Sequence, residues 1–337
     1  MVSKQFVLKR LLLLVPVLLG VATLVFAILH LSPGNPARVI AGDRASEAFV
    51  RQIENDLGLN DPIWVQYGRF LVDTATFDFG RSYVVRRGTP VSEVLRTYFP
   101  VTLELALYGQ FFGILIGVPL GILSAVKQDS LTDHLTRIGA LSGISIPIFW
   151  SGPLLILLLA VQYDLVPTSG RIGVGYSVPA ITGLLTVDSL LAGNLPAFVS
   201  TVKHLLLPSL VIGIYATALI SRMMRSSMLE VVRQDYMRTA RAKGQGAKIT
   251  IMKHGFRNAL IPVVTIIGIQ FGSLLGGAVL TETVFNIPGI GVLLVEAINN
   301  GDYPLVQGTV LLFALLFTLV NLGVDVTYSY LDPRIDQ

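Results

Sequence analysis

Long runs of apolar residues alternate with shorter polar segments along the whole chain. A transmembrane helix needs about 20 mostly apolar residues at a rise of about 1.5 Å each. Six runs reach this length, and they predict membrane-spanning helices over residues 11–31, 101–126, 135–161, 205–223, 259–281 and 305–328. We therefore expect an all-α membrane protein with six transmembrane helices.

Several predicted spans contain residues that weaken or break helices in water. Transmembrane helices tolerate such residues where neighbouring helices or waters satisfy the freed backbone groups. We expect the glycines to allow close helix packing, with a flexible pore lining as the alternative. These residues are Pro16, Pro119, Pro147, Pro153, Gly272, Gly276 and Gly277.

The first span follows a basic start formed by Lys4, Lys9 and Arg10. Its apolar run of about 21 residues is longer than the apolar region of a secretory signal peptide, which is about 7–15 residues. No clear small-residue cleavage site precedes Ser32. We interpret residues 1–31 as an uncleaved anchor helix whose N-terminus lies in the cytoplasm.

Basic residues are concentrated in one loop between the fourth and fifth spans. Residues 222–257 hold nine of the 25 Lys and Arg residues and only two acidic residues. Short loops rich in Lys and Arg remain in the cytoplasm. The long loop 32–100 is balanced, with eight Arg and eight acidic residues, and loops 162–204 and 285–304 are poor in cations. With six spans, this places both termini in the cytoplasm.

Composition narrows the choice of function. Apolar residues make up 53% of the chain and charged residues only 14%, against about 25% charged in soluble domains. The high apolar content excludes disorder, and the absence of Cys excludes disulfides and thiolate metal sites. The four histidines are scattered and no nucleophile, base and acid set is present, so we expect neither a metal site nor an enzyme.

The segment 32–100 carries patterns of a small folded unit outside the membrane. Ser46 can cap a helix that Gly58 ends, Pro62 opens a second helix, and 78–82 is typical of a turn. The second helix has an apolar stripe formed by Trp64, Tyr67, Phe70 and Leu71. We expect either a platform over the outer mouth or a loop that only packs against the bundle.

A short amphipathic helix is predicted within the basic loop. Ser227 and Glu230 fit a capping box at its start, and Gly244 or Gly246 can end it. Its apolar face is formed by Leu229, Val232, Tyr236 and Ala240. A small apolar patch is formed by Tyr236, Met237 and Ala240. Three interpretations remain open: a docking element for another protein, a solvated loop, or a helix lying on anionic lipid. Nucleic-acid binding is disfavoured, because the cations are confined to this loop with few aromatic residues between them.

The loop also resembles a known family. Residues 235–244 (DYMRTARAKG) followed by 257–262 (RNALIP) are similar to the signature of ABC importer permeases, above all the dipeptide, oligopeptide and nickel group. The broader signature has Glu-Ala-Ala and a later Gly. Here Arg238 replaces the Glu, Thr239 replaces the first Ala, and Gly244 takes the place of the Gly. The distance from Gly244 to the following Leu-Ile-Pro is also longer than in the broad pattern.

The resemblance covers nearly the whole chain in the family's order. Further matching segments are Leu57-Gly58-Leu59, Pro62, Gln66-Tyr67, Phe79 to Ser82, Pro100 to Leu105, Ile144 to Trp150, Thr281 to Phe285, Pro288 to Gly291, Asp302 to Pro304 and Asp332 to Arg334. Together they identify the chain as a member of this permease group. The long first outer loop resembles the first of the two permeases in such pairs.

The resemblance implies a type I ABC importer permease bundle in a prokaryotic inner membrane. Its implied partners are a second related permease, two ATP-binding subunits and an extracytoplasmic solute-binding protein. The chain has no Gly-x-x-x-x-Gly-Lys-Ser/Thr motif, so ATP and Mg are expected on the partners and no cofactor here. The implied ATPase-coupling residues are Asp235, Tyr236, Arg238, Thr239, Ala240, Arg241, Ala242, Lys243 and Gly244.

Polar residues in the spans are candidates for the translocation pathway. Charged residues at the bilayer centre cost about 2.5–3.5 kcal/mol on insertion scales, so Glu104, Glu282 and Asp325 each require an explanation. Glu104 or Glu282 can meet the ammonium end of a peptide, although pairing within the protein is the simpler explanation. Gln110 and Gln270 are candidates for lining a wet pathway.

These observations predict an organisation and a cargo. We expect an anchor (1–31), an extracytoplasmic region (32–100), a five-helix core (101–330) containing the coupling loop 222–257, and a cytoplasmic tail (331–337). The resemblance implies import of dipeptides or short oligopeptides. Alternative cargoes are a nickel chelate, glutathione or another small solute. A secondary transporter is the alternative outside the family, but we see no inverted repeats.

Overall fold

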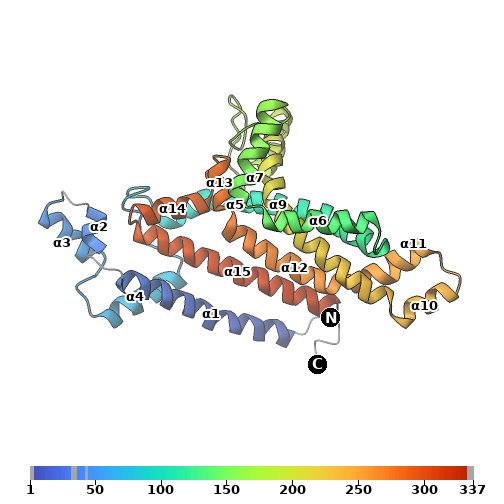
Figure 1. The fold of residues 1–337 in the computed structure, drawn as a ribbon. Helices are drawn as coiled ribbons and strands as arrows, with labels where there is room; N and C mark the ends of the chain where they lie inside the picture. The colour runs from blue at the N-terminus through green and yellow to red at the C-terminus, as the bar shows by residue number, and fades with distance from the viewer. Residues whose placement is uncertain (1–3, 32–35, 42–44, 332–337) are drawn as a thin grey trace.

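The computed structural model describes residues 4–31, 36–41 and 45–331 (Figure 1). Within these residues the chain forms α-helices, two π-helical segments and turns, and no β-strand. The expectation of an all-α protein is therefore confirmed for the described part of the chain. The predicted tail, apart from Leu331, and the Asp332 to Arg334 segment lie outside it.

Among the residues that the structure describes, five helices are each long and apolar enough to cross a membrane, and a bent pair raises the number of possible spans to six. The five lie in α1 (Lys4–Leu31), α5 (Val91–Val126), α9 (Leu195–Val232), α12 (Phe256–Gly277) and α15 (Tyr303–Leu331). The bent pair joins α6 (Leu131–Ser145) to α7 (Ile148–Leu155) and the π-helical η1 (Ile156–Gln162). The predicted six spans are therefore reached only if the bent pair counts as one span.

The third predicted span, over 135–161, is present as a broken span and not as one continuous helix. The chain bends by 106° between α6 and α7, and α7 stands away from the main bundle in Figure 1. Pro147 lies at the break, and Ile146 before it has extended φ and ψ of −84° and 118°. Proline has no N–H to donate and disfavours helical geometry in the preceding residue, which explains the position of the bend.

Two spans are longer than hydropathy indicated. α5 begins at Val91 rather than near 101, and α9 covers Leu195–Val232 rather than 205–223. The extension of α5 is amphipathic, because Val91, Val94 and Leu95 are buried whereas Glu93 and Arg96 are exposed. A hydropathy window detects the apolar middle of such a helix and misses its amphipathic end.

α5 and α9 run parallel in very close contact. Their contact surface on α5 is a row of glycines at intervals of four residues, Gly109, Gly113, Gly117 and Gly121. A Cβ atom at Gly109 would lie 2.5 Å from Ile212, and one at Gly121 would lie 2.6 Å from the carbonyl oxygen of Ser221. Small residues allow helix backbones in membranes to approach this closely.

The glycines predicted to pack closely in α12 behave differently from one another. A Cβ at Gly272 would lie 2.7 Å from the ring of Phe317 on α15, so this glycine does allow close packing. Gly276 has no atom within 4 Å of such a Cβ. Close packing is confirmed for Gly272 and not for Gly276, whereas Gly277, the third glycine of the prediction, lies outside the residues whose surroundings the structure describes.

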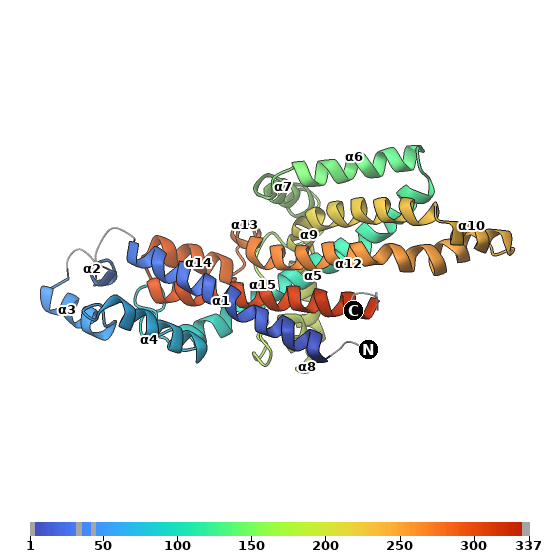
Figure 2. The same ribbon diagram turned by 90° about the horizontal axis from the view of Figure 1, so that it is seen from below.

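The two ends of the bundle carry different extensions (Figures 1 and 2). One end carries α2 (Pro36–Ala41), α3 (Glu47–Asp56) and α4 (Ile63–Ala75). The other carries α10 (Asp235–Ala242), α11 (Ala247–Ile249) and the π-helical η2 (Thr250–Gly255). α1 begins and α15 ends at the α10 end in both views. The predicted topology requires this arrangement.

Three short helices complete the fold. α8 (Leu185–Leu191) lies in the connection between η1 and α9, and α13 (Val279–Val284) and α14 (Ile290–Asn299) connect α12 to α15. The connection from α12 to α15 turns at Asn286, which has a φ of +50°. The positions of α8, α13 and α14 bring several sequence motifs into contact.

The predicted elements of the outer segment are confirmed. Ser46 accepts a hydrogen bond from the backbone N–H of Phe49 at the start of α3, Gly58 ends that helix with a φ of +64°, and Pro62 precedes α4.

The predicted apolar stripe of α4 is only partly correct. Tyr67 and Phe70 lie against the ring of Phe26 in α1, at 5.2 and 5.5 Å between ring centres. Trp64 is 73% exposed.

Candidate functional site

α10 is a separate short helix rather than the continuation of α9. α9 extends through Ser227 to Val232, and Ser227 is buried inside it. The predicted helix start at the Ser227 capping box is therefore wrong. Met224 and Met228 are fully buried on α9, and their packing keeps this stretch helical. The chain then breaks at Arg233 and Gln234, and the extended backbone of Gln234 begins α10.

Met237 attaches α10 to the bundle. Its side chain is completely buried, and a Cβ at Gly255 of η2 would lie 3.3 Å from Met237 Cε and 3.5 Å from Met228 Cε. Met237 therefore packs between α9 and η2 and does not belong to an exposed patch, contrary to the sequence-based expectation. A second link is polar, because Asn258 of α12 donates a hydrogen bond to the hydroxyl of Tyr236 at 3.0 Å.

The opposite face of α10 is open and basic. Ala240 is half-buried, and the other candidate coupling residues in this helix and its C-terminal turn are exposed. Arg238 lies 3.8 Å from Asp235, but both side chains are mostly exposed at 77% and 96%, so this pair contributes little. Gly244 closes the helix with a φ of +79°. The geometry offers a small, firmly attached helix with a cationic outer face.

Glu282 lies at the centre of a second group of candidate residues. Its carboxylate accepts hydrogen bonds from Thr102 Oγ1 at 2.5 Å and from the backbone N–H of Val292 at 3.0 Å. The N–H of Ile290 in turn donates to Thr102 Oγ1 at 2.8 Å. A Cβ at Gly289 would lie only 2.1 Å from Glu282 Oε1. Three motifs separated in sequence therefore meet around one buried carboxylate.

Glu104 is also fully satisfied by the protein. Arg171 donates to its Oε2 at 2.5 Å, and Thr186 donates to Oε1 through its backbone N–H at 2.8 Å and its hydroxyl at 2.7 Å. These bonds fix the segment between η1 and α9 to α5. For both Glu104 and Glu282, the contacts favour pairing within the protein over a direct role in meeting cargo.

Gln110 and Gln270 differ from the two glutamates. Both side chains are buried, at 6% and 5% exposure. Within the described residues, neither atom of the Gln110 amide has a hydrogen-bond partner, and neither does Nε2 of Gln270. An unsatisfied buried polar group costs about 1–3 kcal/mol. These amides therefore have hydrogen-bonding capacity that the described residues leave unused.

Three further acidic residues connect elements. Asp325 pairs with Arg10 at 2.9 Å and so joins α15 to α1. Asp302 accepts hydrogen bonds from Ser82 Oγ at 2.5 Å and from the backbone N–H groups of Val84 and Val85. These bonds hold the segments 79–82 and 302–304 together. Asp133 pairs with Arg225. Sequence reasoning missed Asp133, although a charged residue beside a predicted span was a signal for it.

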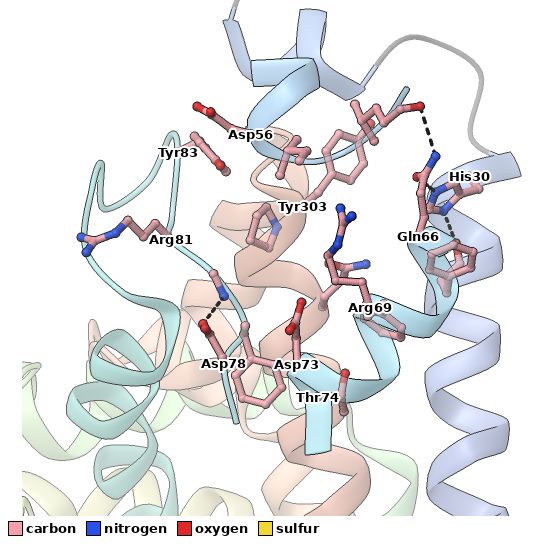
Figure 3. A pocket seen from close by; sticks show the side chains of 18 residues that line it. His30, Asp56, Gln66, Arg69, Asp73, Thr74, Asp78, Arg81, Tyr83 and Tyr303 are labelled. Carbon is pink, nitrogen blue, oxygen red and sulfur yellow. Dashed lines mark hydrogen bonds between the residues drawn. The ribbon is translucent and has the colours of Figure 1, made fainter. Parts of the chain in front are cut away.

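A pocket lined by both charged and apolar side chains lies between the outer segment and the bundle. Its volume is about 260 Å³, and Figure 3 shows side chains from α1, α4, the 78–83 turn and the start of α15 around it. His30 and Gln66 join α1 to α4 through a hydrogen bond of 3.0 Å between Nε2 and Oε1. The outer segment is therefore a folded unit seated on the spanning helices through Tyr303 and its neighbours.

The described residues contain no group of three or more His, Cys, Asp or Glu residues that could hold a metal ion. The geometry at α10 suits mechanical attachment, and the unpartnered amides of Gln110 and Gln270 suit contact with a solute.

Two family descriptions match the chain. Residues 117–337 match "Binding-protein-dependent transport system inner membrane component", and residues 3–106 match the N-terminal region of such membrane components.

Curated relatives match along almost the whole chain. The chain is 46% identical over 330 residues to the dipeptide transport system permease protein DppB of Alkalihalophilus pseudofirmus, with 98% of each chain covered. It is 44% identical to DppB of Escherichia coli K12, again with 98% of each chain covered. It is 42% identical to the glutathione transport system permease protein GsiC of Salmonella paratyphi A, with 98% of each covered.

Proposed function

The chain belongs to the family of binding-protein-dependent transport system inner membrane components, and we propose that it imports short peptides as the permease subunit of an ABC transporter. The peptide class is supported by full-length identities of 46% and 44% to dipeptide permeases. Glutathione is the alternative cargo, supported by the 42% identity to a glutathione permease.

The observation that carries the coupling mechanism is the attachment of α10. This helix presents Arg238, Arg241 and Lys243 outward, while Met237 is buried against the ends of α9 and η2. A helix with one buried anchor and an open cationic face is suited to fit a groove on another subunit. The groove would belong to an ATP-binding partner, since this sequence carries no phosphate-binding motif of its own.

Movement of α10 passes directly into two spanning helices. Met237 packs near Met228 of α9, and Tyr236 is hydrogen-bonded to Asn258 of α12. A displacement of α10 would therefore tilt α9 and α12 together rather than bend a loose loop. Packed helices switch between discrete arrangements, so this tilt would change the side from which the pathway is open.

Four buried polar residues have different proposed roles in the pathway. Gln110 and Gln270 would line it and exchange hydrogen bonds with water or with the amide groups of a peptide, because their own amides lack partners among the described residues. Glu104 and Glu282 would hold the wall of the pathway in place, because their carboxylates already bind Arg171 and Thr102.

The proposed assembly contains a second permease, two ATP-binding subunits and a solute-binding protein. It would lie in an inner membrane with α10 and both ends of this chain in the cytoplasm. The basic outer face of α10 and the excess of cations in 222–257 support this orientation. The folded segment between α3 and the start of α5 would then face the solute-binding protein.

A cross-linking experiment tests the coupling proposal. The chain has no Cys, so a single cysteine introduced at Ala240 is the only thiol of this chain. In the assembled transporter, a cross-linker attached to this thiol should capture an ATP-binding subunit. A cysteine at Thr76, at the other end of the bundle, is the matched control and should not. Capture from Thr76 but not from Ala240 would contradict the proposed orientation and docking.

Uptake into vesicles tests the cargo. The vesicles are right-side-out and contain the complete transporter and its binding protein. Labelled dipeptides should accumulate only with internal ATP. Accumulation of glutathione with no dipeptide accumulation would replace the peptide assignment by the alternative.

A further inference from the structure

A second pocket lies between α6 and α9, near the turn that joins α5 to α6. Its volume is about 320 Å³. Arg137 of α6 and Arg222 and Arg225 of α9 line it, together with four hydroxyl side chains. It is separate from the outer pocket and from α10, and neither coupling nor passage of cargo makes use of it in the mechanism above.

One of the three arginines is already neutralised. Arg225 forms two hydrogen bonds of 2.7 Å with the carboxylate of Asp133, which is completely buried. The same carboxylate also accepts bonds from Ser124 Oγ at 2.5 Å and from the backbone N–H of Asp129 at 3.0 Å. Asp133 therefore has no capacity left to bind a second guanidinium, and its bonds fix α6 against α9.

The charges of the other two arginines are not neutralised by a partner among the described residues. Arg137 and Arg222 have no ion pair and no hydrogen bond among the described residues, and both are exposed at the pocket. Two guanidinium groups at one cavity repel each other unless an anion lies between them. Arginine is suited to phosphate because its planar donors match the phosphate oxygens in pairs.

The lining changes from polar to apolar along α6. Arg137 lies in the middle of α6, and Ala140, Leu141 and Ile144 line the pocket farther along this helix, whereas Arg222 and Arg225 belong to α9. Leu141 is 60% exposed, as are Leu135 and Ile138 on the same helix. This gradient fits an amphiphile, since a free phosphate or a carboxylate would gain nothing from the apolar end.

The depth of the pocket agrees with a lipid headgroup. Arg137 lies six residues after the start of α6 at Leu131, which is about 9 Å along the helix axis. Arginine side chains near the ends of spans extend their charge to the membrane interface. Basic pockets between transmembrane helices are a recognised form of binding site for anionic lipid headgroups.

We propose that this pocket binds an anionic phospholipid, with its phosphate between Arg137 and Arg222 and an acyl chain along the exposed apolar side of α6. The inference requires only that the chain lies in a membrane and not that the cargo is a peptide. The lipid would shield the two charges and join α6 to α9 beside the bond of Asp133 with Arg225.

Native mass spectrometry of the full chain, titrated with phosphatidylglycerol or phosphatidylcholine, tests the proposal. The wild-type chain should retain phosphatidylglycerol in preference to phosphatidylcholine. The double variant R137Q/R222Q should bind phosphatidylglycerol about 30-fold more weakly, from about 1 kcal/mol for each basic residue. The variant R137K/R222K keeps both charges and should retain most of the preference for phosphatidylglycerol.

A matched control removes two other cations near the same end of the bundle. Lys127 and Arg233 are exposed and do not line the pocket, so K127Q/R233Q should bind phosphatidylglycerol like the wild type. Equal binding of the two lipids, or equal loss in K127Q/R233Q and R137Q/R222Q, would overturn the proposal. Normal elution of each variant on size-exclusion chromatography excludes misfolding as the cause of a loss.

Two further measurements distinguish the lipid from other occupants. Inorganic phosphate at millimolar concentration should not displace phosphatidylglycerol. Displacement at that concentration would show a site for a free anion and overturn the lipid assignment. The assembled transporter should still carry the lipid, and its loss on assembly would show that the second permease occupies this face instead.

Discussion

Glu282 accepts hydrogen bonds from a threonine on α5 and a backbone N–H on α14, with Gly289 packed directly against its carboxylate. Glu104 and Asp302 act in the same way at other connections. A buried carboxylate with several donors is stable, whereas the loss of one partner leaves the others unsatisfied. Single residues therefore determine how the connecting segments lie on the spanning helices.

Gly289→Ala tests this packing at the residue scale. The added Cβ would lie 2.1 Å from Glu282 Oε1, so we expect a loss of about 1–3 kcal/mol from overpacking and a lower melting temperature in detergent. Gly139→Ala on α6 is the control, because a Cβ there meets no atom within 4 Å. The control should leave the melting temperature unchanged or raise it. Equal effects of the two variants would contradict the tight fit.

Asp188 gives a prediction of pH dependence. Burial alone would raise its pKa, but hydrogen bonds from Thr182 and from the backbone N–H groups of Thr182, Gly183 and Ile181 outweigh burial and lower the pKa. A carboxyl whose folded pKa is lowered stabilises the fold above its unfolded pKa, about 3.9. That contribution is lost as the pH falls through the lower folded pKa.

Hydrogen exchange measures this contribution locally. The amides of residues 181–183 should lose protection as the pH falls below about 4, after correction for intrinsic exchange. Asp188→Asn should remove this pH dependence, and Asp164→Asn, at a neighbouring turn outside the hydrogen-bonded group, should preserve it. A wild-type profile that is flat below pH 4 would argue against the role of Asp188.

At the scale of elements, α5 and α9 depend on a glycine surface. The four glycines on α5 let the two backbones approach without side chains between them. This contact lies in the middle of the bundle, beside the buried residues Leu105, Val211 and Ile212. Both helices also carry residues of the proposed pathway or coupling route, so their spacing affects function.

Gly113→Leu should separate α5 from α9. A Cβ at this position would already lie 2.8 Å from the Cβ of Ala216, so the larger side chain should reduce the yield of monodisperse protein and lower its melting temperature. Gly323→Leu on α15 is the control, since a Cβ there meets nothing within 4 Å. Size-exclusion chromatography and thermal unfolding provide the comparison. Similar yields and melting temperatures for both variants would show that the glycine row is dispensable.

The end of α10 provides a test that separates backbone conformation from space. Gly244 and Gly246 both have open surroundings, but only Gly244 has a positive φ, of +79°. Gly244→Val should therefore strain the turn by about 1–2 kcal/mol, displace the end of α10 and reduce ATP-dependent uptake if the proposed docking is correct. Gly246→Val should transport like the wild type. Loss of uptake in both variants would indicate contact with a partner instead of backbone strain.

At the scale of the whole molecule, α10 and the outer segment lie at opposite ends of the bundle (Figure 1). The start of α1 and the end of α15 lie at the α10 end, where Arg10 pairs with Asp325. The proposed coupling at one end and delivery at the other would require the bundle between them to transmit movement. The continuous helices α5 and α9 are long enough to do so.

Arg241→Glu tests the coupling of the whole transporter. Arg241 is exposed on α10, and the variant reverses the charge at this position. If docking loses about 1.4 kcal/mol, ATP-dependent uptake should fall at least about tenfold. Membrane abundance, measured by immunoblot, should remain equal to that of the wild type. Lys203→Glu, exposed on α9 and outside both α10 and the segment proposed to face the solute-binding protein, is the charge-reversal control. Unchanged uptake in Arg241→Glu would contradict docking through this face.

Sequence patterns predicted local elements well and their contacts poorly. Ser46 and Pro62 marked the starts of α3 and α4 because capping acts within a few residues. The capping pattern at Ser227 failed because tertiary packing of Met224 and Met228 extends α9 past it. Met237 was assigned to an exposed patch because a sequence does not indicate which side of a short helix meets the bundle.

The sequence by itself determined that this chain is helical, spans a membrane and belongs to a family of transport permeases, since apolar length and ordered motifs are properties of the chain alone. Only the tertiary structure decided that Glu104 and Glu282 are paired, that Gln110 and Gln270 lack partners among the described residues, and that Met237 anchors α10. The physical reason is that burial and hydrogen bonding depend on residues far apart in the sequence, such as Ser82 and Asp302, which are 220 positions apart. Local patterns contain no information about which of those residues meet.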